Sequence, residues 1–203
     1  MIAAIILAAG ESSRMGSPKA LLAYPLPGGG ETTFAEHLID VFDRSGAAPV
    51  LVVIGHESDR IRGALDWRRA RPVDNPRYRE GMLSSIRSGL AALEETPVEG
   101  ALVCPVDHPA ASPDVIGELI ESFERTRAPM VLPVAAGRRG HPVLFSRAVF
   151  AELMSAPDAV GARQVVWDHE SDLLEVEVSE RGVRVDLDTP AEYERWFSER
   201  RGR

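Results

Sequence analysis

Two cations and several small residues share one loop near the start of the chain. Residues 7–19 read Leu-Ala-Ala-Gly-Glu-Ser-Ser-Arg-Met-Gly-Ser-Pro-Lys. Small side chains at positions 8–10 let a ligand approach the backbone, whose amide groups can then face an anion. Arg14 can hold phosphate oxygens through two hydrogen bonds, whereas Lys19 acts as a mobile point charge. The loop therefore predicts a phosphate site, and an ordinary surface turn with two solvated cations is the alternative.

Three aspartates have the spacing expected of metal ligands. Asp107 follows a buried apolar segment, and Asp186 and Asp188 alternate within Val-Asp-Leu-Asp-Thr-Pro. In an extended segment, alternate side chains face the same side. Mg²⁺ prefers a few hard oxygen ligands, completed by water and phosphate oxygens. The sequence therefore predicts a Mg²⁺ site made by Asp107 with Asp186 or Asp188. The alternative is that these aspartates form turns or cap a helix.

A glycine and a serine precede an expected helix in the segment Gly-Met-Leu-Ser at positions 81–84. Gly81 and Ser84 could contact a base or a ribose, and Asn75 is a weaker candidate. Capping of the helix by the serine is the alternative.

Two arginines between glycines form a second cationic loop, Gly-Arg-Arg-Gly-His-Pro at positions 137–142. Arg138 and Arg139 suit a phosphorylated molecule, with Gly140 and His141 directly after them. For His141, a structural role in the turn is the alternative.

The elements that must position these residues alternate between buried strands and amphipathic helices. Strands are predicted at 2–8, 50–54, 101–106, 130–134, 142–145, 173–178 and 182–187. Helices are predicted at 33–44, 57–65, 82–93, 113–127, 147–154 and 190–197, the last of these capped by Thr189. This alternation predicts an α/β protein with a mostly parallel central sheet between helix layers. Ligands of such sheets bind beyond the carboxyl ends of the strands, where the first loop and Asp107 fall.

Composition limits the organisation and the partners. A chain of 203 residues with 44% hydrophobic content suits one domain, expected at 1–198, with a solvated tail at 199–203. The net charge of -8 argues against nucleic-acid coating, and no apolar run is long enough to span a membrane. With Cys104 as the single cysteine, no intramolecular disulfide can form, so we expect a reducing cytoplasm.

Taken together, the motifs resemble those of the MobA-like NTP transferases, and more narrowly the molybdenum-cofactor cytidylyltransferase branch. The resemblance runs from residue 1 to about residue 196 and implies a GT-A/Rossmann-like, three-layer α/β/α sandwich. It implies that the nucleotide contacts Leu7, Ala8, Ala9, Gly10, Asn75, Gly81 and Ser84, with its phosphates on Arg14 and Lys19. It further implies metal ligation by Asp107 with Asp186 or Asp188, and acceptor binding by Arg138, Arg139, Gly140 and His141.

The expected reaction is an attack by an acceptor phosphate on the α-phosphorus of an NTP, with pyrophosphate leaving. The acceptor phosphate is already ionised near neutral pH, so placement and charge neutralisation by Arg14, Lys19 and Asp107 with Mg²⁺ are expected to suffice.

The first loop also suggests a nucleotide. In the family, the CTP-using branch tends to carry Leu-Ala-Ala-Gly, as here, whereas the guanylyl branch more often has Leu-Ala-Gly-Gly. The methyl group of Ala9 would narrow the space for a purine, so CTP and a molybdopterin-type acceptor are expected, with a cofactor-receiving enzyme as a partner. The alternatives are a nucleotidyltransferase for sugar phosphates or other small phosphates, and a non-catalytic protein that binds nucleotide or hands over a cofactor. Asp-His-Pro at 107–109 departs from the family, where other residues are common between Asp and Pro.

Overall fold

The computed structural model describes residues 1–201 of the chain, with side chains described to residue 200. The strands are β1 (Ile2–Ala8), β2 (Ala23–Pro25), β3 (Glu31–Thr33), β4 (Val50–Ile54), β5 (Arg71–Asp74), β6 (Gly100–Pro105), β7 (Met130–Ala135), β8 (Arg138–Arg139), β9 (Val143–Ser146) and β10 (Leu174–Glu177). The α-helices are α1 (Phe34–Arg44), α2 (Ser58–Ala64), α3 (Met82–Ala91), α4 (Pro113–Thr126), α5 (Phe150–Ser155), α6 (Arg163–Asp168) and α7 (Pro190–Arg201).

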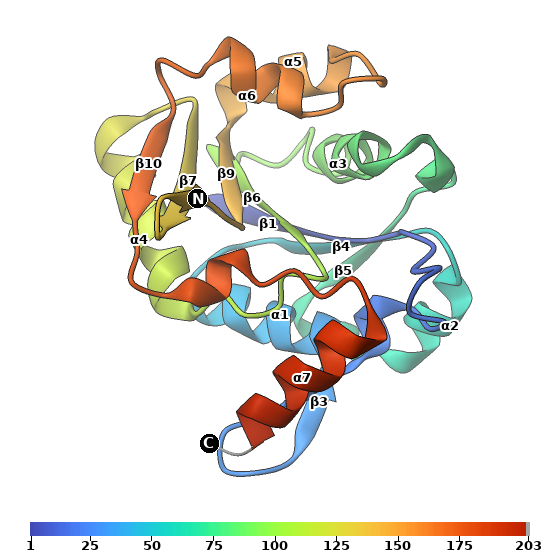
Figure 1. Ribbon diagram of the computed structural model, residues 1–203. Coiled ribbons are helices and arrows are strands. Elements are labelled where there is room, and N and C mark those ends of the chain that lie inside the picture. Colours follow the sequence, from blue (N-terminus) through green and yellow to red (C-terminus); the bar gives the residue numbers. More distant parts are fainter. Residues whose placement is uncertain (202–203) are drawn as a thin grey trace.

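One mixed sheet crosses the molecule in the order β10-β7-β9-β6-β1-β4-β5, with β8 added beside β7. β1 is parallel to both of its neighbours, β4 and β6, whereas β9 is antiparallel to β6 and β7. Helices α3, α5 and α6 lie on one side of the sheet, and α1, α2 and α4 lie on the other (Figure 1). The predicted three-layer α/β sandwich with a mostly parallel sheet is confirmed.

β1 lies inside the sheet, and all seven of its residues are buried. Its even-numbered residues pack in the same apolar cluster as α1, α2 and α4. Its odd-numbered residues pack in a second cluster with α3, α5 and α6. A strand buried on both faces needs such a continuous apolar run, because successive side chains point to opposite faces.

Local sequence fixes the start of several helices. Thr33 caps α1 in a capping box with Glu36, whose carboxylate accepts from the Thr33 backbone amide. Ser112 caps α4, and Pro113 occupies its first turn, where a missing amide hydrogen costs nothing. Thr189 accepts from the backbone amide of Glu192 at the start of α7, so the cap predicted at Thr189 is confirmed.

The structure differs from the prediction where the apolar pattern is weak. β5 reads Arg-Pro-Val-Asp and pairs only with β4 at the sheet edge, so no continuous apolar run marks it. The short β2–β3 hairpin and α6 were also missed. The strand predicted at 182–187 was wrong, because Arg181–Arg184 form a 3₁₀-helix. Gly182 packs so tightly that an added Cβ would lie 2.1 Å from the Ala110 carbonyl oxygen, which leaves no room for a side chain there.

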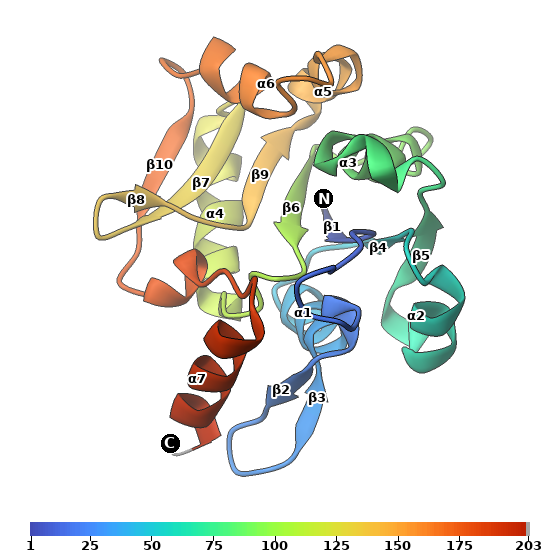
Figure 2. The same ribbon diagram turned by 45° about the vertical axis from the view of Figure 1, so that its right-hand side comes forward.

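The chain end continues α7 through Arg201, so three residues of the expected tail belong to this helix, and residues 202–203 lie outside the described residues. The Arg200 guanidinium lies 5.3 Å from the centre of the Tyr24 ring. The Tyr193 hydroxyl donates to the Ala23 carbonyl at 3.0 Å, which ties α7 to the β2–β3 hairpin below the sheet (Figure 2). A domain boundary at residue 198 stays a prediction.

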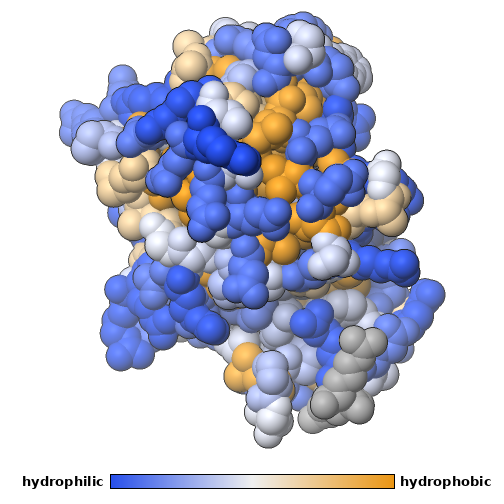
Figure 3. Space-filling model, turned by 90° about the vertical axis from the view of Figure 1, so that its left-hand side faces the viewer, coloured by the Kyte–Doolittle hydropathy of each residue, from blue (hydrophilic) through white to orange (hydrophobic). Residues whose placement is uncertain are grey.

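The surface is mainly hydrophilic, with hydrophobic side chains exposed in a hollow on the face of Figure 3. Among the described residues, none of the helices has both the length and the apolar character that crossing a membrane requires.

Helix α3 can approach β1 only because it carries Gly89. A Cβ at Gly89 would lie 2.5 Å from Cγ2 of the fully buried Ile5. We expect Gly89→Ala to lower the free energy of unfolding by about 1–3 kcal/mol through overpacking. Gly117→Ala in α4 is the matched control, because no atom lies within 4 Å of its added Cβ. The control should stabilise the protein by about 0.5–1 kcal/mol, and urea titration measures both. Equal effects of the two substitutions would contradict the packing argument.

Candidate active site

A cleft of about 290 Å³ opens at the carboxyl ends of β1 and β6. The chain runs outward from β1 through β4 to β5 and returns to the other side of β1 with β6. The cleft therefore lies where the strand order reverses, the usual ligand position in open α/β sheets. It is lined by Leu7, Ala8, Ala9, Gly10, Ser12, Ser13, Arg14, Lys19, Ala20, Tyr78, Gly81, Met82, Ser85, Pro105, Val106, Asp107 and Asp188.

Backbone hydrogen bonds from neighbouring segments hold the start of the first loop in place. The Val106 amide donates to the Leu7 carbonyl and the His56 amide donates to the Ala9 carbonyl, each at 3.0 Å. Gly55 allows the start of the loop to pack against the wall of the cleft that carries Tyr78. Any side chain at position 55 would prevent this, because an added Cβ would lie 2.8 Å from the Tyr78 Cβ and 3.0 Å from the Ala9 Cβ. The backbone of this loop is thus held at the cleft edge.

Lys19 is the central charge of the cleft and the only lysine in the sequence. Its Nζ donates to Oδ2 of Asp107 at 2.6 Å and to Oδ1 of Asp188 at 2.5 Å. Only 11% of its side chain is exposed. Arg14 pairs with the second oxygen of Asp188, Oδ2, at 2.7 Å. One cation therefore joins three parts of the chain, near residues 19, 107 and 188.

These contacts fix the charge states near neutral pH. Burial alone would lower the pKa of Lys19, but hydrogen bonds to Asp107 and Asp188 outweigh it and raise this pKa above its usual value. The same hydrogen bond from Lys19 lowers the pKa of the Asp188 carboxyl. Partial burial raises the pKa of Asp186, and the nearby Asp107 charge adds to this rise. A protonated Lys19 thus faces an ionised Asp188.

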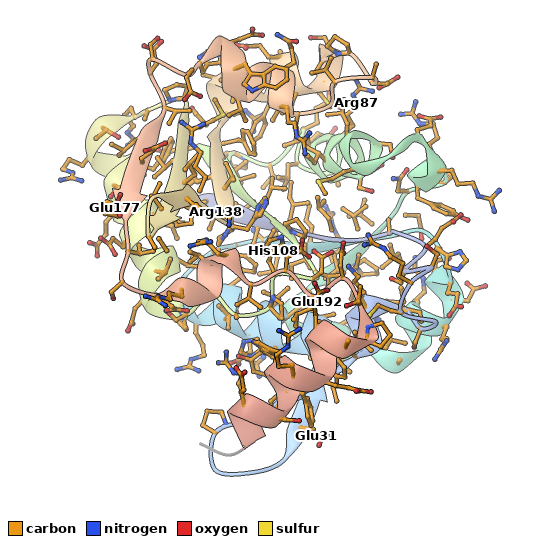
Figure 4. All side chains as sticks on the ribbon, viewed as in Figure 1. Glu31, Arg87, His108, Arg138, Glu177 and Glu192 are labelled. Carbon is orange, nitrogen blue, oxygen red and sulfur yellow. The ribbon has the colours of Figure 1, made fainter. Side chains whose placement is uncertain are left out.

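The C-terminal arm, residues 181–188, closes the site from the side. The Leu187 amide donates to the Asp107 carbonyl at 3.1 Å, and the Glu192 carboxylate accepts from the Asp188 amide at 3.2 Å. This arm brings Asp186 to Asp107 and His108, whose ligand atoms all lie within 4.8 Å of one another. His108 and Glu192 are labelled near the centre of Figure 4. The two aspartates of the arm therefore separate, with Asp188 on the cations and Asp186 beside His108.

Two histidines meet behind the carboxylates. The rings of His108 and His141 have centroids 4.5 Å apart, and each Nδ1 is buried without a hydrogen-bond partner among the described residues. Burial lowers the pKa of His141 to about 4 and also lowers the pKa of His108, so both rings are neutral near pH 7. The sequence analysis singled out His108 only as a departure from the family between Asp107 and Pro109.

Two of the expected nucleotide contacts lie behind the cleft wall. Asn75 and Ser84 are buried, and the Asn75 amide donates to Oγ of Ser84 at 2.9 Å and to Oγ of Ser85 at 3.0 Å. Ser85, Tyr78 and Met82 line the cleft, and sequence reasoning did not single them out. The adjacent Ser-Ser pair was the available signal for Ser85, but helical phase decides which hydroxyl faces the cleft.

The residues of the expected acceptor loop at 137–142 also lie in different surroundings. The Arg139 guanidinium is tied to Glu170 and Glu175 by contacts of 2.5 and 2.6 Å, and Arg138 is exposed on β8 (Figure 4). Gly140 is buried where an added Cβ would lie 2.4 Å from the Val183 carbonyl oxygen. The His141 amide donates to that carbonyl at 2.8 Å. The loop thus joins the C-terminal arm through Gly140 and His141, whereas Arg139 points to acidic partners.

Residues 4–173 match the family model described as the MobA-like NTP transferase domain. The chain belongs to the MobA-like NTP transferase family. It is 31% identical over 197 residues to a probable molybdenum cofactor guanylyltransferase of Mycobacterium marinum, covering 94% of this chain and 90% of that one. The family model ends before Asp186 and Asp188, so these carboxylates lie outside its match.

Solved structures of similar proteins share the whole fold. The crystal structure of Rv0371c from Mycobacterium tuberculosis H37Rv superposes with a TM-score of 0.83 at 28% identity, over 97% of each chain. A complex of Rv0371c with manganese gives a TM-score of 0.77 at 25% identity, over 97% of this chain and 98% of that one.

The expected preference for CTP is not supported. The similar M. marinum protein is named a guanylyltransferase, not a cytidylyltransferase. In the structure Ala9 lines the cleft but is only 2% exposed, and its Cβ would lie 3.0 Å from a Cβ added at Gly55. The name of this relative does not support the CTP preference that was expected from Ala9.

Lys19→Met should weaken NTP binding, because it removes a cation and leaves a side chain of similar length. A charge-assisted hydrogen bond contributes about 1.5–3 kcal/mol, so we expect a roughly 10- to 100-fold rise in Kd. Isothermal titration calorimetry with GTP measures it. Arg44→Met, which removes an exposed cation at the end of α1, is the matched control. Unchanged GTP affinity in the Lys19 variant would remove Lys19 from the site.

Proposed function

We propose that this nucleotidyltransferase moves a nucleoside monophosphate from GTP to the phosphate of a molybdopterin-type acceptor and releases pyrophosphate. The observation that carries the proposal is the partly buried Lys19 cation held by Asp107 and Asp188 at the end of the first loop. Anion-binding backbone, cations and carboxylates in one cleft are the parts that phosphoryl chemistry needs. The guanylyltransferase name of the M. marinum relative supports GTP and the molybdenum cofactor.

The triphosphate would compete with carboxylates for the two cations. Lys19 and Arg14 both pair with Asp188, and phosphate oxygens would offer both cations a denser negative charge. Moving them onto the triphosphate neutralises the departing pyrophosphate. The first loop then aligns the α-phosphorus for in-line attack, and no covalent intermediate or strong general base is required.

A divalent metal fits the donor set of the cleft. Asp107, Asp186 and His108 would hold the ion, whereas both oxygens of Asp188 already contact cations. When bound, the metal would reduce the repulsion between acceptor and α-phosphate. The manganese complex of Rv0371c supports a divalent ion. Of the two alternatives that the sequence left open, Asp186 is the second aspartate ligand in this proposal.

A pyrophosphate-release assay tests the function. Four NTPs are tested against molybdopterin and a panel of sugar phosphates, with a divalent metal present. We expect pyrophosphate release only when GTP and molybdopterin are both supplied. Turnover of sugar phosphates would favour the alternative of a sugar-phosphate nucleotidyltransferase. Tight GTP binding without release with any acceptor would favour a nucleotide-binding or cofactor-handover protein.

Asp107→Asn should lower kcat by roughly 100-fold or more, because it removes a charge that positions both Lys19 and the metal. The amide keeps the size of the side chain, so an unchanged circular dichroism spectrum is expected. Asp59→Asn, on exposed α2, is the matched control. Near-normal turnover of the Asp107 variant would refute its metal and positioning roles.

A further inference from the structure

A group of aromatic side chains outside the cleft ties α7 to α1 and to the β2–β3 hairpin. The Tyr24 ring stacks on His37 with centroids 3.5 Å apart and meets Trp196 at 5.3 Å. Phe34 packs at 5.8 Å against two rings of α7, those of Tyr193 and Trp196. Figure 2 shows α7 beside the hairpin. We call these five side chains the aromatic brace.

The aromatic brace is firm because its rings are packed together and largely withdrawn from water. Tyr24, Phe34 and Trp196 are buried. Burial lowers the pKa of His37 to about 4, so its ring is neutral near pH 7 and stacks on Tyr24 without a charge to solvate. The Arg200 guanidinium lies 5.0 Å from the centre of the Trp196 ring. Packed aromatic contacts of this kind hold a fixed geometry better than exposed ion pairs do.

Two contacts join the end of the first loop to the start of α7. Lys19 opens a 3₁₀ turn that ends just before β2, the strand that begins at Ala23. Asp188 lies just before α7, and Tyr193 lies in the first turn of this helix. The Lys19–Asp188 ion pair spans the two segments at 2.5 Å, and the Tyr193 hydroxyl spans them again at 3.0 Å by donating to the Ala23 carbonyl. The second contact and the packed rings therefore set the spacing at which the ion pair forms.

We infer that the aromatic brace holds Asp188 against Lys19 and Arg14, so that this carboxylate competes with an entering triphosphate and helps to displace the departing pyrophosphate. Tyr193 is then a positioning residue that acts on the phosphates only through Asp188. The inference rests on the proposed function for the reaction. It adds the return of both cations to the protein when the product leaves.

The contacts of Asp188 make this competition direct. Its Oδ1 pairs with Lys19 at 2.5 Å and its Oδ2 pairs with Arg14 at 2.7 Å. A polyphosphate that binds both cations must take both partners from Asp188. A carboxylate fixed beside the vacated cations has a high effective concentration there, so it recaptures them readily. A carboxylate on a loosely held arm would compete less well.

Calorimetry with inorganic pyrophosphate and with GTP tests the inference without turnover. Tyr193→Phe removes the hydrogen bond to Ala23 and keeps the ring. Because Asp188 then competes less well, we expect the Kd of both ligands to fall by roughly 2- to 5-fold, the range of a weak ion pair. In an Asp188→Asn background, the same substitution should change either Kd by less than about 1.5-fold, because the brace has lost the carboxylate that it positions.

Trp67→Phe is the matched control. It removes a similar hydrogen bond, from Trp67 Nε1 to the Arg62 carbonyl at 2.8 Å, outside the aromatic brace. Both Kd values should stay within about 1.5-fold of wild type, in either background. Should Tyr193→Phe fail to fold, Trp196→Phe shortens the contact with Tyr24 on the other side of the brace and should tighten pyrophosphate binding in the same way.

Three outcomes would overturn the inference: unchanged or weaker binding in the brace variants, equal tightening with and without the Asp188 carboxylate, or equal tightening in the Trp67 control. A side chain that only stabilised the fold would not tighten binding when it is removed. A protein that binds pyrophosphate as expected here but releases none from GTP would speak against the proposed function alone. Normal turnover with GTP, combined with an unchanged pyrophosphate Kd in the brace variants, would speak against this inference alone.

Discussion

The ion pairing of the partly buried Lys19 ammonium group is the interaction on which the cleft depends. Two carboxylates, from the end of β6 and from the segment before α7, converge on it. Without this cation, Asp107 and Asp188 would repel each other in a partly desolvated space, where like charges interact more strongly than in water. The ion pair therefore holds the C-terminal arm against the sheet and also keeps a positive charge ready for an anion.

The surrounding backbone makes this convergence possible through close packing at glycines. Gly140 and Gly182 let the loop at 137–142 and the C-terminal arm approach carbonyl oxygens at distances that no side chain would permit. Gly55 does the same between the first loop and the wall that carries Tyr78. The cleft is thus shaped by backbone contacts between segments far apart in the sequence, and charged side chains occupy the space that these contacts leave.

The sequence predicted the central part of the fold because both faces of the sheet are buried. Long apolar runs such as β1 and amphipathic helices such as α4 carry a clear periodic pattern. The edge strand β5 carries none. The alternating apolar residues of the arm at 181–188 predicted a strand that does not form, because the position of the arm depends on contacts with distant segments. In the site, only the tertiary structure shows that Lys19 pairs with two aspartates and that Asp186 and Asp188 have different neighbours. The burial of Ser84 depended on helical phase, and that of Asn75 on its hydrogen bonds to α3, and local motifs fix neither.

A chain with a single lysine carries one side-chain amine, and here that amine lies in the cleft. Reductive methylation with ¹³C-formaldehyde would place isotope only on Lys19 and on the N-terminal amine of Met1, which pairs with Glu99 outside the cleft. Each labelled amine has its own chemical environment, so the N-terminal resonance serves as an internal reference. The Lys19 resonance would report directly on whether its ammonium group faces carboxylates or phosphates. The composition of this protein thus supplies a spectroscopic probe at the centre of its own site, without any engineered substitution.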